Sequence, residues 1–226
     1  MNSYSYRNDP IFLRNQYETH GKNEFPYIRK QEMDLNRIKL IALSDTRPND
    51  RKENCQKIVH GFLDDYRIHV YYNNPDKHRN KLSQYRALIS PDYSDWREMN
   101  TWREIESVAH SRWVGKHWQE AWKMPVIPSV TWSSPASFEF CFDGIERGCW
   151  VAISTVGSKL SSKAFLRGYE AMLDHIEPAG IICLGKPYPE MRGNIIYVPY
   201  QYPKHSPINQ LDLPFEEYES VCFASL

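Results

Sequence analysis

Short apolar runs alternate with longer amphipathic or polar stretches along the chain from Ile38 onward. This alternation is typical of parallel β-strands that are joined by crossover helices. Most of the runs are continuously apolar, which is what strands buried on both faces require. The pattern therefore predicts an α/β fold with a mainly parallel sheet and helices on both faces. The predicted strands span residues 38–43, 68–72, 87–90, 126–132, 150–155, 181–185 and 195–200.

The stretches between these runs predict crossover helices at residues 53–66, 76–85, 99–122 and 161–176. In the helix at 99–122, apolar residues recur at spacings of three and four, which predicts a stripe buried in the core. The stripe consists of Trp102, Ile105, Ala109 and Trp113, and Val114, Trp118 and Trp122 extend it. Stacking of nucleic-acid bases is the alternative use of such a series of tryptophans.

Residues 1–36 differ from the rest of the chain, because they are rich in tyrosine, asparagine and arginine and show little periodicity. We expect an aromatic-rich N-terminal arm there, followed by a single α/β domain over residues 37–226. A small or incomplete β/α barrel is the alternative architecture, since polar residues follow strand after strand. Pro128 lies inside a predicted strand, and because proline lacks the backbone donor we expect that strand to bend there.

The charge balance argues against one class of partner. The 226 residues contain 28 Lys and Arg against 28 Asp and Glu. This balance excludes a generally basic protein that binds nucleic acid through its net charge, although a local basic patch can still exist. No run approaches the roughly 18 apolar residues of a membrane span, and the first ten residues lack the apolar core of a secretion signal. We therefore expect a cytoplasmic protein with no membrane partner.

Cysteine and histidine do not form a metal-binding pattern. The 5 cysteines are scattered, which favours small buried apolar side chains over disulfides or a zinc site. His110 and His117 would lie about 10 Å apart along a helix axis, too far to share one metal ion. No metal site is predicted.

Polar residues follow each predicted strand, and ligands of parallel sheets bind at the carboxyl ends of the strands. Asp92 follows an apolar strand and Pro91. Its carboxylate could act as a general acid or base or as a metal ligand, or it could cap a turn. Trp132, at the end of another strand, could stack on a base or a sugar.

One loop between a strand and a helix combines hydroxyl groups, a glycine and a lysine: Ser154, Thr155, Gly157 and Lys159. Such a loop can gather backbone N–H groups, a helix N-terminus and an ammonium group around an anion. It does not have the spacing of a Walker A loop. Lys186 ends the next predicted strand and would join Lys159 in an anion site if the two strands are neighbours.

Five segments resemble, in order, the motifs of an uncharacterised family: residues 90–94 (SPDYS), 112–119 (RWVGKHWQ), 126–132 (VIPSVTW), 138–145 (FEFCFDGI) and 151–157 (VAISTVG). The tail at 165–187 resembles the family as well, and the likeness covers residues 86–200. This family is a domain of unknown function of bacteriophages, prophages and mobile elements of Gram-positive bacteria. The resemblance implies a phage or mobile-element protein that acts on nucleic acid, nucleotides or host defence, and it implies no catalytic residue.

Three functions stay open at this point. The first is a phage accessory protein that binds a phosphate-bearing ligand, namely a nucleotide, a nucleotide signal or a nucleic-acid end, through the candidate residues above. The second is an enzyme that acts on such a substrate with Asp92 as acid, base or ligand of a divalent metal; only this alternative implies a metal cofactor. The third is an interaction module whose tyrosines and tryptophans contact a host protein.

Overall fold

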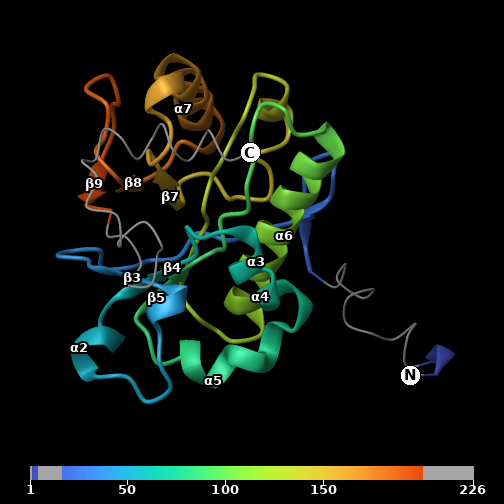
Figure 1. Cartoon of the computed structure of the whole chain (residues 1–226), viewed down its shortest axis with the longest axis vertical. Coiled ribbons are helices and arrows are strands. Elements are labelled where there is room, and N and C mark those ends of the chain that lie inside the picture. The colour runs from blue at the N-terminus through green and yellow to red at the C-terminus, as the bar shows by residue number, and fades with distance from the viewer. Residues whose placement is uncertain (1, 5–16, 201–226) are drawn as a thin grey trace, which may run out of the picture.

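The computed structural model describes residues 2–4 and 17–200 (Figure 1). The strands are β1 (Thr19–His20), β2 (Phe25–Pro26), β3 (Leu40–Ala42), β4 (Ile58–His60), β5 (Ala87–Ile89), β6 (Val126–Ile127), β7 (Trp150–Ser154), β8 (Gly180–Leu184) and β9 (Ile195–Val198). The helices are α2 (Lys52–Cys55), α3 (Asp65–Ile68), α4 (Val70–Asn73), α5 (Arg79–Leu82), α6 (Thr101–Glu120) and α7 (Ser162–Ile176). Short 3-10 turns are η1 (Leu43–Asp45), η2 (Pro75–His78), η3 (Ser137–Glu139) and η4 (Lys159–Ser161).

Two parallel sheets form the centre of the molecule. One has the strand order β3-β4-β5-β6 and the other the order β7-β8-β9, and all pairs in both are parallel. A parallel bridge between Ser129 and Ala152 joins the two sheets. The strands from β3 to β9 therefore follow one another in chain order and run in one direction. The predicted α/β fold with a mainly parallel sheet is confirmed.

The predicted bend at Pro128 is where the chain passes from one sheet to the other. Before the proline, β6 pairs with β5. After it, the Ala152 N–H donates to the Pro128 carbonyl (2.9 Å) and the Val130 N–H donates to the Ala152 carbonyl (2.9 Å). The chain thus changes its pairing partner from β5 to β7 at Pro128. Because proline has no backbone N–H, the change leaves no N–H group without an acceptor at this residue.

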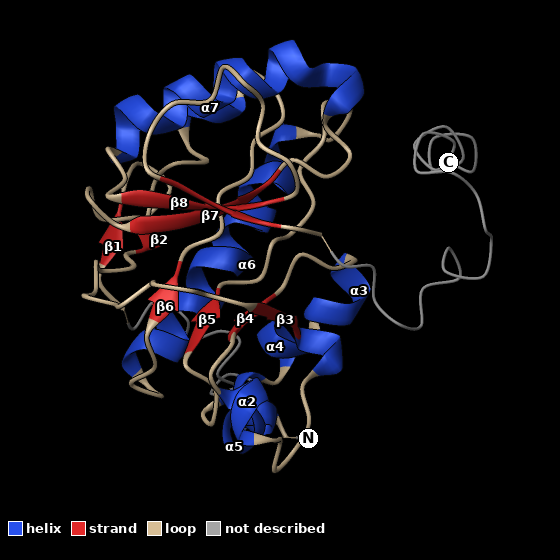
Figure 2. Cartoon of the chain, turned by 90° about the vertical axis from the view of Figure 1, so that its left-hand side faces the viewer, coloured by secondary structure: helices blue, strands red, loops and turns tan. Residues whose placement is uncertain are grey.

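Side chains alternate along the strands between an inner and an outer core. The inner side chains of both sheets form one apolar cluster: Ile58, Ala87, Ile89, Ile127, Ala152, Ile182 and Leu184. The outer faces are covered by helices, with α7 on one side of the molecule and the short helices α2 to α5 on the opposite side (Figure 2). Chain-order strands, an inner core and outer helices are the features of the alternative prediction, an incomplete β/α barrel.

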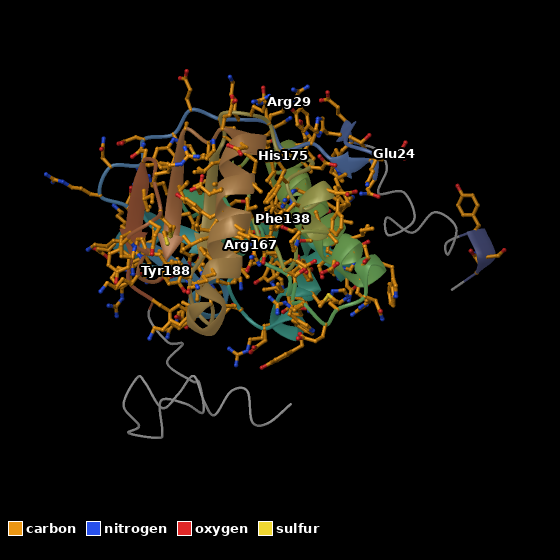
Figure 3. All side chains as sticks on the ribbon, turned by 90° about the horizontal axis from the view of Figure 1, so that it is seen from above. Glu24, Arg29, Phe138, Arg167, His175 and Tyr188 are labelled. Atoms are coloured by element: carbon orange, nitrogen blue, oxygen red, sulfur yellow. The ribbon has the colours of Figure 1, made fainter. Side chains whose placement is uncertain are left out.

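Helix α6 packs into the interior. Trp113, Trp118 and Trp122 are buried, so the predicted core packing of these tryptophans is confirmed. Trp102 was predicted in the same stripe, but it is 62% exposed because the first turn of the helix extends past the core. Seen from above, α7 lies between strands β8 and β9 on one side and α6 on the other (Figure 3).

Two predicted elements were wrong. Residues 68–72 are helical rather than a strand, since Ile68 and Tyr71 are buried one turn apart and Tyr71 packs on Trp118 with 5.9 Å between ring centroids. Residues 53–66 are not one helix, because they contain β4. That strand has 3 residues, too few to show a period, and it is defined by its pairing with β3 and β5.

Residues 17–36 pack against the rest of the described chain. β1 and β2 form an antiparallel pair, Phe25 and Ile28 are buried, and Ile28 forms a parallel bridge with Ile145. Residues 5–16 of the predicted arm lie outside the described residues, as do residues 201–226. The division of the chain at residue 36 therefore stays a prediction.

The buried cysteines agree with the sequence analysis. Cys141, Cys149 and Cys183 are free and buried, and burial raises the pKa of Cys149 and Cys183 to about 12. Such thiols stay neutral and behave as small apolar groups. Among the described residues, none of the helices combines the length and the apolar character that crossing a bilayer demands.

Candidate functional site

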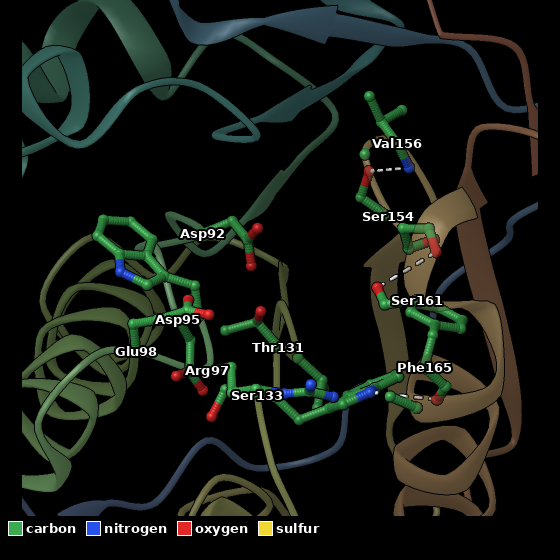
Figure 4. A pocket seen from close by; sticks show the side chains of 16 residues that line it. Asp92, Asp95, Arg97, Glu98, Thr131, Ser133, Ser154, Val156, Ser161 and Phe165 are labelled. Carbon is green, nitrogen blue, oxygen red and sulfur yellow. Dashed lines mark hydrogen bonds between the residues drawn. The ribbon is translucent and has the colours of Figure 1, made fainter. Parts of the chain in front are cut away.

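A pocket of about 410 Å³ opens at the carboxyl ends of β5, β6 and β7. Figure 4 shows that its two sides differ in chemistry. One side, here called the acidic wall, consists of Asp92, Asp95, Trp96, Arg97 and Glu98. The facing side, the serine wall, consists of Ser154, Val156, Gly157, Ser158, Ser161, Ala164 and Phe165. Residues 130–133, which follow β6, lie between the two walls.

Asp92 is the most deeply placed carboxyl group of the acidic wall. Its Oδ1 is buried and receives no hydrogen bond from the described residues. Burial raises the pKa of Asp92 to about 7, and the negative charge of Asp65 adds to this, while Arg112 acts in the opposite direction. A carboxyl group with this pKa is poised near neutral pH to accept or to donate a proton.

A second carboxyl group, Asp95, stands beside Glu104 from the first turn of α6. The pKa of Asp95 is raised to about 7, first by burial and then by the charge of Glu104. Glu104 is only 3% exposed and accepts a hydrogen bond from the Ser133 hydroxyl. The acidic wall is thus tied to α6 and to the segment after β6.

The acidic wall is anchored from below by α3. Asp65 Oδ1 accepts hydrogen bonds from the Ser94 N–H and from the Ser94 hydroxyl, both at 2.9 Å. The Ser107 hydroxyl of α6 donates to the Ser94 carbonyl (2.9 Å). A Cβ on Gly61 would lie 2.9 Å from the Cα of Pro91, so glycine allows the ends of β4 and β5 to approach closely.

Arg112 of α6 lies buried beneath the pocket. Its guanidinium donates to the carbonyls of Ser129 (2.9 Å), Cys141 (2.7 Å) and Asp143 (2.9 Å). Burial lowers the pKa of Arg112 to about 10, so the group still carries its charge at neutral pH. These hydrogen bonds hold in place the segments at Ser129, Cys141 and Asp143, here called the pocket floor.

A buried group of hydroxyls lies next to this arginine. The Oγ atoms of Ser90, Ser111 and Ser129 are 3.1 to 3.2 Å from one another. The Ser129 hydroxyl also contacts the Pro91 carbonyl (3.2 Å), directly before Asp92. The end of β5, helix α6 and the segment after β6 are therefore joined directly by hydrogen bonds.

The serine wall is a tight turn followed by a helix. The Val156 N–H donates to Ser154 Oγ (3.2 Å), and the Ser158 hydroxyl contacts the Thr155 carbonyl and the Tyr188 hydroxyl, both at 2.8 Å. Gly157 has a φ of 78°, which favours glycine, and a Cβ there would meet nothing within 4 Å. The turn ends at η4 and the N-terminus of α7, where backbone N–H groups are not used within the helix.

The structure brings four of the seven predicted ligand-binding residues to this pocket: Asp92, Trp132, Ser154 and Gly157. Thr155 is buried behind the wall, where its hydroxyl donates to the Lys186 carbonyl (3.1 Å). β7 and β8 are neighbours, which was the condition set for a two-lysine site. However, Lys159 and Lys186 have exposed side chains and are not among the residues that line this pocket.

The two tryptophans of the pocket differ in accessibility. Trp132 is 9% exposed; its Nε1 donates to the Phe165 carbonyl (3.2 Å), and a Cβ on Gly168 would lie 2.2 Å from its ring. Trp96 is 53% exposed and lines the acidic wall. Trp96, which the sequence analysis did not single out, therefore offers more free ring surface for stacking than Trp132.

Sequence reasoning also missed Asp95, Glu104 and the anchoring role of Asp65. One signal was available, because Asp95 and Trp96 follow Asp92 in the same segment between a strand and a helix. No comparable signal marks Glu104 and Asp65, which reach the site from other helices. Among the described residues, no group of three or more His, Cys, Asp or Glu side chains is placed to hold a metal ion.

Comparison with known proteins identifies the family. The family described as "Domain of unknown function (DUF4417)" matches residues 17–203. The chain belongs to this family. The match includes the region of the predicted resemblance, residues 86–200, and extends it to residue 17, so that both walls and the β1–β2 pair fall inside it.

Two relatives of this chain come from phages. The chain is 33% identical over 181 residues to the "Gene 1 protein" of Mycobacterium phage L5, which covers 79% of this chain and 78% of the relative. It is 36% identical over 131 residues to the "Gene 1 protein" of Mycobacterium phage D29, which covers 57% of this chain and 48% of the relative. No solved structure matches the chain. The expected phage family is confirmed.

Proposed function

We propose that this DUF4417 protein binds a small phosphate-bearing ligand of nucleotide size in the pocket between the acidic wall and the serine wall. One observation carries the proposal, namely that the pocket has carboxyl groups on one side and a hydroxyl-rich helix N-terminus on the other. A nucleotide has the same two-sided chemistry, since it combines an anionic phosphate with a ring and ribose that donate hydrogen bonds. Its volume also suits a pocket of about 410 Å³.

The serine wall is the side for the phosphate. Backbone N–H groups at the start of α7 and the positive end of its dipole attract an anion, and the hydroxyls of Ser158 and Ser161 lie at the same end. Lys159 directly follows Ser158 in sequence, and Lys186 follows the neighbouring strand β8. Their exposed ammonium groups add positive charge at the rim of the pocket.

The acidic wall is the side for the ring and the ribose. Trp96 offers an exposed indole face for stacking, which contributes about 1–3 kcal/mol per base in proteins that bind single strands. Asp92 lines the pocket, and its Oδ1, which has no donor in the described residues, can accept a hydrogen bond from an amino or hydroxyl group of the ligand.

Calorimetric titration of the full chain with AMP, GMP, ATP and inorganic phosphate tests the proposal. We expect at least one nucleotide to bind more tightly than phosphate alone, and we expect Lys159→Ala and Asp92→Asn to weaken that binding roughly tenfold. Lys52→Ala is the matched control, because Lys52 is an exposed lysine of α2, on the opposite side of the molecule from α7. Absence of binding across this set, or equal weakening by the control, would contradict the proposal.

A second candidate function is favoured by the raised pKa of Asp92. A buried carboxyl group with a pKa of about 7 inside a ligand-sized pocket suits general acid or base catalysis on the bound nucleotide, with or without a divalent metal. Mass spectrometry of nucleotides incubated with the protein and Mg²⁺ separates the two functions. Turnover that disappears in Asp92→Asn supports the enzyme, whereas retained and unchanged nucleotide supports the binding protein. Contact with a host protein stays a prediction.

A further inference from the structure

Two buried carboxyl groups lie close together at the base of the acidic wall. Glu104, which is only 3% exposed, raises the pKa of Asp95 both by its charge and as a hydrogen-bonding neighbour. Both oxygens of Asp95 are buried, and neither has a hydrogen-bond partner among the described residues. The nearby Ser133 hydroxyl lowers the pKa of Asp95, but it donates its hydrogen bond to Glu104. No lysine, arginine or histidine of the described chain forms an ion pair with either group.

The surroundings of the pair do not neutralise a double negative charge. Ser133 donates one hydrogen bond to Glu104, and the Cys141 thiol near Asp95 is neutral because burial raises its pKa. Asp92 adds a further carboxyl group rather than a cation. Arg112, the buried cation of this region, directs its N–H groups to backbone carbonyls. Two ionised carboxylates in contact under these conditions repel each other strongly.

We propose that Asp95 and Glu104 share one proton, and that this proton latches the acidic wall to α6. The latch concerns regulation of the site, and its effect on nucleotide binding rests on the proposed function. Asp95 leads directly into Trp96, Arg97 and Glu98, which line the pocket. Loss of the proton separates Asp95 from Glu104 and moves this wall, so that the pocket changes shape. Asp92, at the start of the wall, carries the same kind of unpartnered buried oxygen and depends on the same packing.

The direction of the pH effect follows from the protonation states. The pKa of Asp95 rises from an ordinary 3.8 to about 7 in the folded protein. Between these values the folded state holds a proton that the unfolded state has lost, so the contribution of this group to stability falls as the pH rises. Above about 7 the proton leaves the folded protein as well, and the latch opens.

Hydrogen exchange of the full chain, without any ligand, tests the latch. After correction for the intrinsic rates, we expect protection of residues 93–100 to fall roughly tenfold between about pH 6 and about pH 8. Glu104→Gln and Asp95→Asn each place an amide donor where the shared proton lies, so both variants should keep the protection at the higher pH. Glu106→Gln, an exposed glutamate of α6 paired with Arg103, is the control and should behave as the wild type.

Carbon-13 titration of the wild-type carboxyl groups gives a second readout that requires no variant to fold. A shared proton predicts that the Asp95 carboxyl group titrates near pH 7 rather than at its ordinary value. A single step at ordinary values, or unchanged protection of residues 93–100 in the wild type, overturns the latch. Titration with AMP, GMP, ATP and inorganic phosphate at both pH values then distinguishes the proposals. If none of them binds at the lower pH, the proposed function fails while the latch stands.

Discussion

The two walls of the pocket are built from the same kind of segment, a loop that leaves a parallel strand and leads into a helix, but they are held differently. The serine wall rests on neutral contacts, such as those of Ser158 with the Thr155 carbonyl and the Tyr188 hydroxyl. The acidic wall rests on carboxyl groups, namely the half-buried Asp65 and the pair of Asp95 with Glu104. The comparison teaches that one side of a site can be insensitive to pH while the facing side changes its shape with a proton.

The charged groups on the two sides of the pocket also differ in their exposure to solvent. Asp92 and Asp95 have oxygens that solvent does not reach, whereas Lys159 and Lys186 are exposed. Solvent and salt screen the exposed lysines, but they screen the buried carboxyl groups much less. Substitutions on the acidic side should therefore have the larger and more pH-dependent effects.

The largest effect is expected from the cation beneath the acidic wall. Arg112→Met leaves the carbonyls of Ser129, Cys141 and Asp143 without their donor, and we expect the free energy of unfolding to fall by about 3–5 kcal/mol. Urea unfolding measures the loss. Arg103→Met, which removes an exposed arginine of the same helix, should change stability by less than about 0.5 kcal/mol. Equal midpoints for the two variants would show that Arg112 does not hold the floor.

A smaller effect is expected behind the serine wall. Gly168→Ala puts a Cβ about 2.2 Å from the ring of Trp132, so α7 or the ring must shift, and the free energy of unfolding should fall by about 1–3 kcal/mol. In a Trp132→Ala background the same substitution should destabilise the protein by less than half as much, because the ring is gone. Equal effects in the two backgrounds would contradict this packing.

Asp65→Asn tests how much a neighbouring charge contributes to the raised pKa of Asp92 in the acidic wall. The negative charge of Asp65 is the second cause, after burial, of the raised pKa of Asp92. Its removal should move that pKa down from about 7 while leaving it above its ordinary value. The free energy of unfolding should then decline less steeply between about pH 4 and about pH 7, because the difference in bound protons between the folded and unfolded states becomes smaller. Carbon-13 titration of Asp92 measures the shift, and the exposed Asp64→Asn should leave it unchanged.

The smallest effect is expected within the serine wall. Ser158→Ala removes the contacts with the Thr155 carbonyl and the Tyr188 hydroxyl, and it should lower the free energy of unfolding by about 1 kcal/mol. Tyr188→Phe removes only one of these contacts and should have a smaller effect. Because no ionisable carboxyl group takes part, the loss should be the same at about pH 5 and about pH 8. A loss that grows with pH would remove the contrast between the walls.

The long periodic elements could be predicted from the sequence. α6 has 20 residues and α7 has 15, which is enough for apolar positions to recur several times, and both were placed within a few residues of their true ends. β4 was missed because its 3 residues form a strand only through their partners on both sides. Local pattern cannot reveal an element whose stability comes from pairing.

The candidate site was predictable only in part for the same reason. Asp92 and Ser154 were found because strand ends of a parallel arrangement meet at one edge. Thr155 follows the same rule in sequence, yet its hydroxyl turns to the Lys186 carbonyl behind the wall. The direction of a side chain at a strand end depends on the turn that follows it.

The sequence by itself determined the α/β class, the main helices, the edge at which polar residues gather, and membership of a phage family. Each of these depends on residue type and short-range spacing along the chain. Only the tertiary structure decided that Asp95 meets Glu104, that Asp65 raises the pKa of Asp92, and that Trp96 rather than Trp132 is the more exposed ring. These properties arise from burial and from charges brought together from separate elements, and neither exists until the chain is folded.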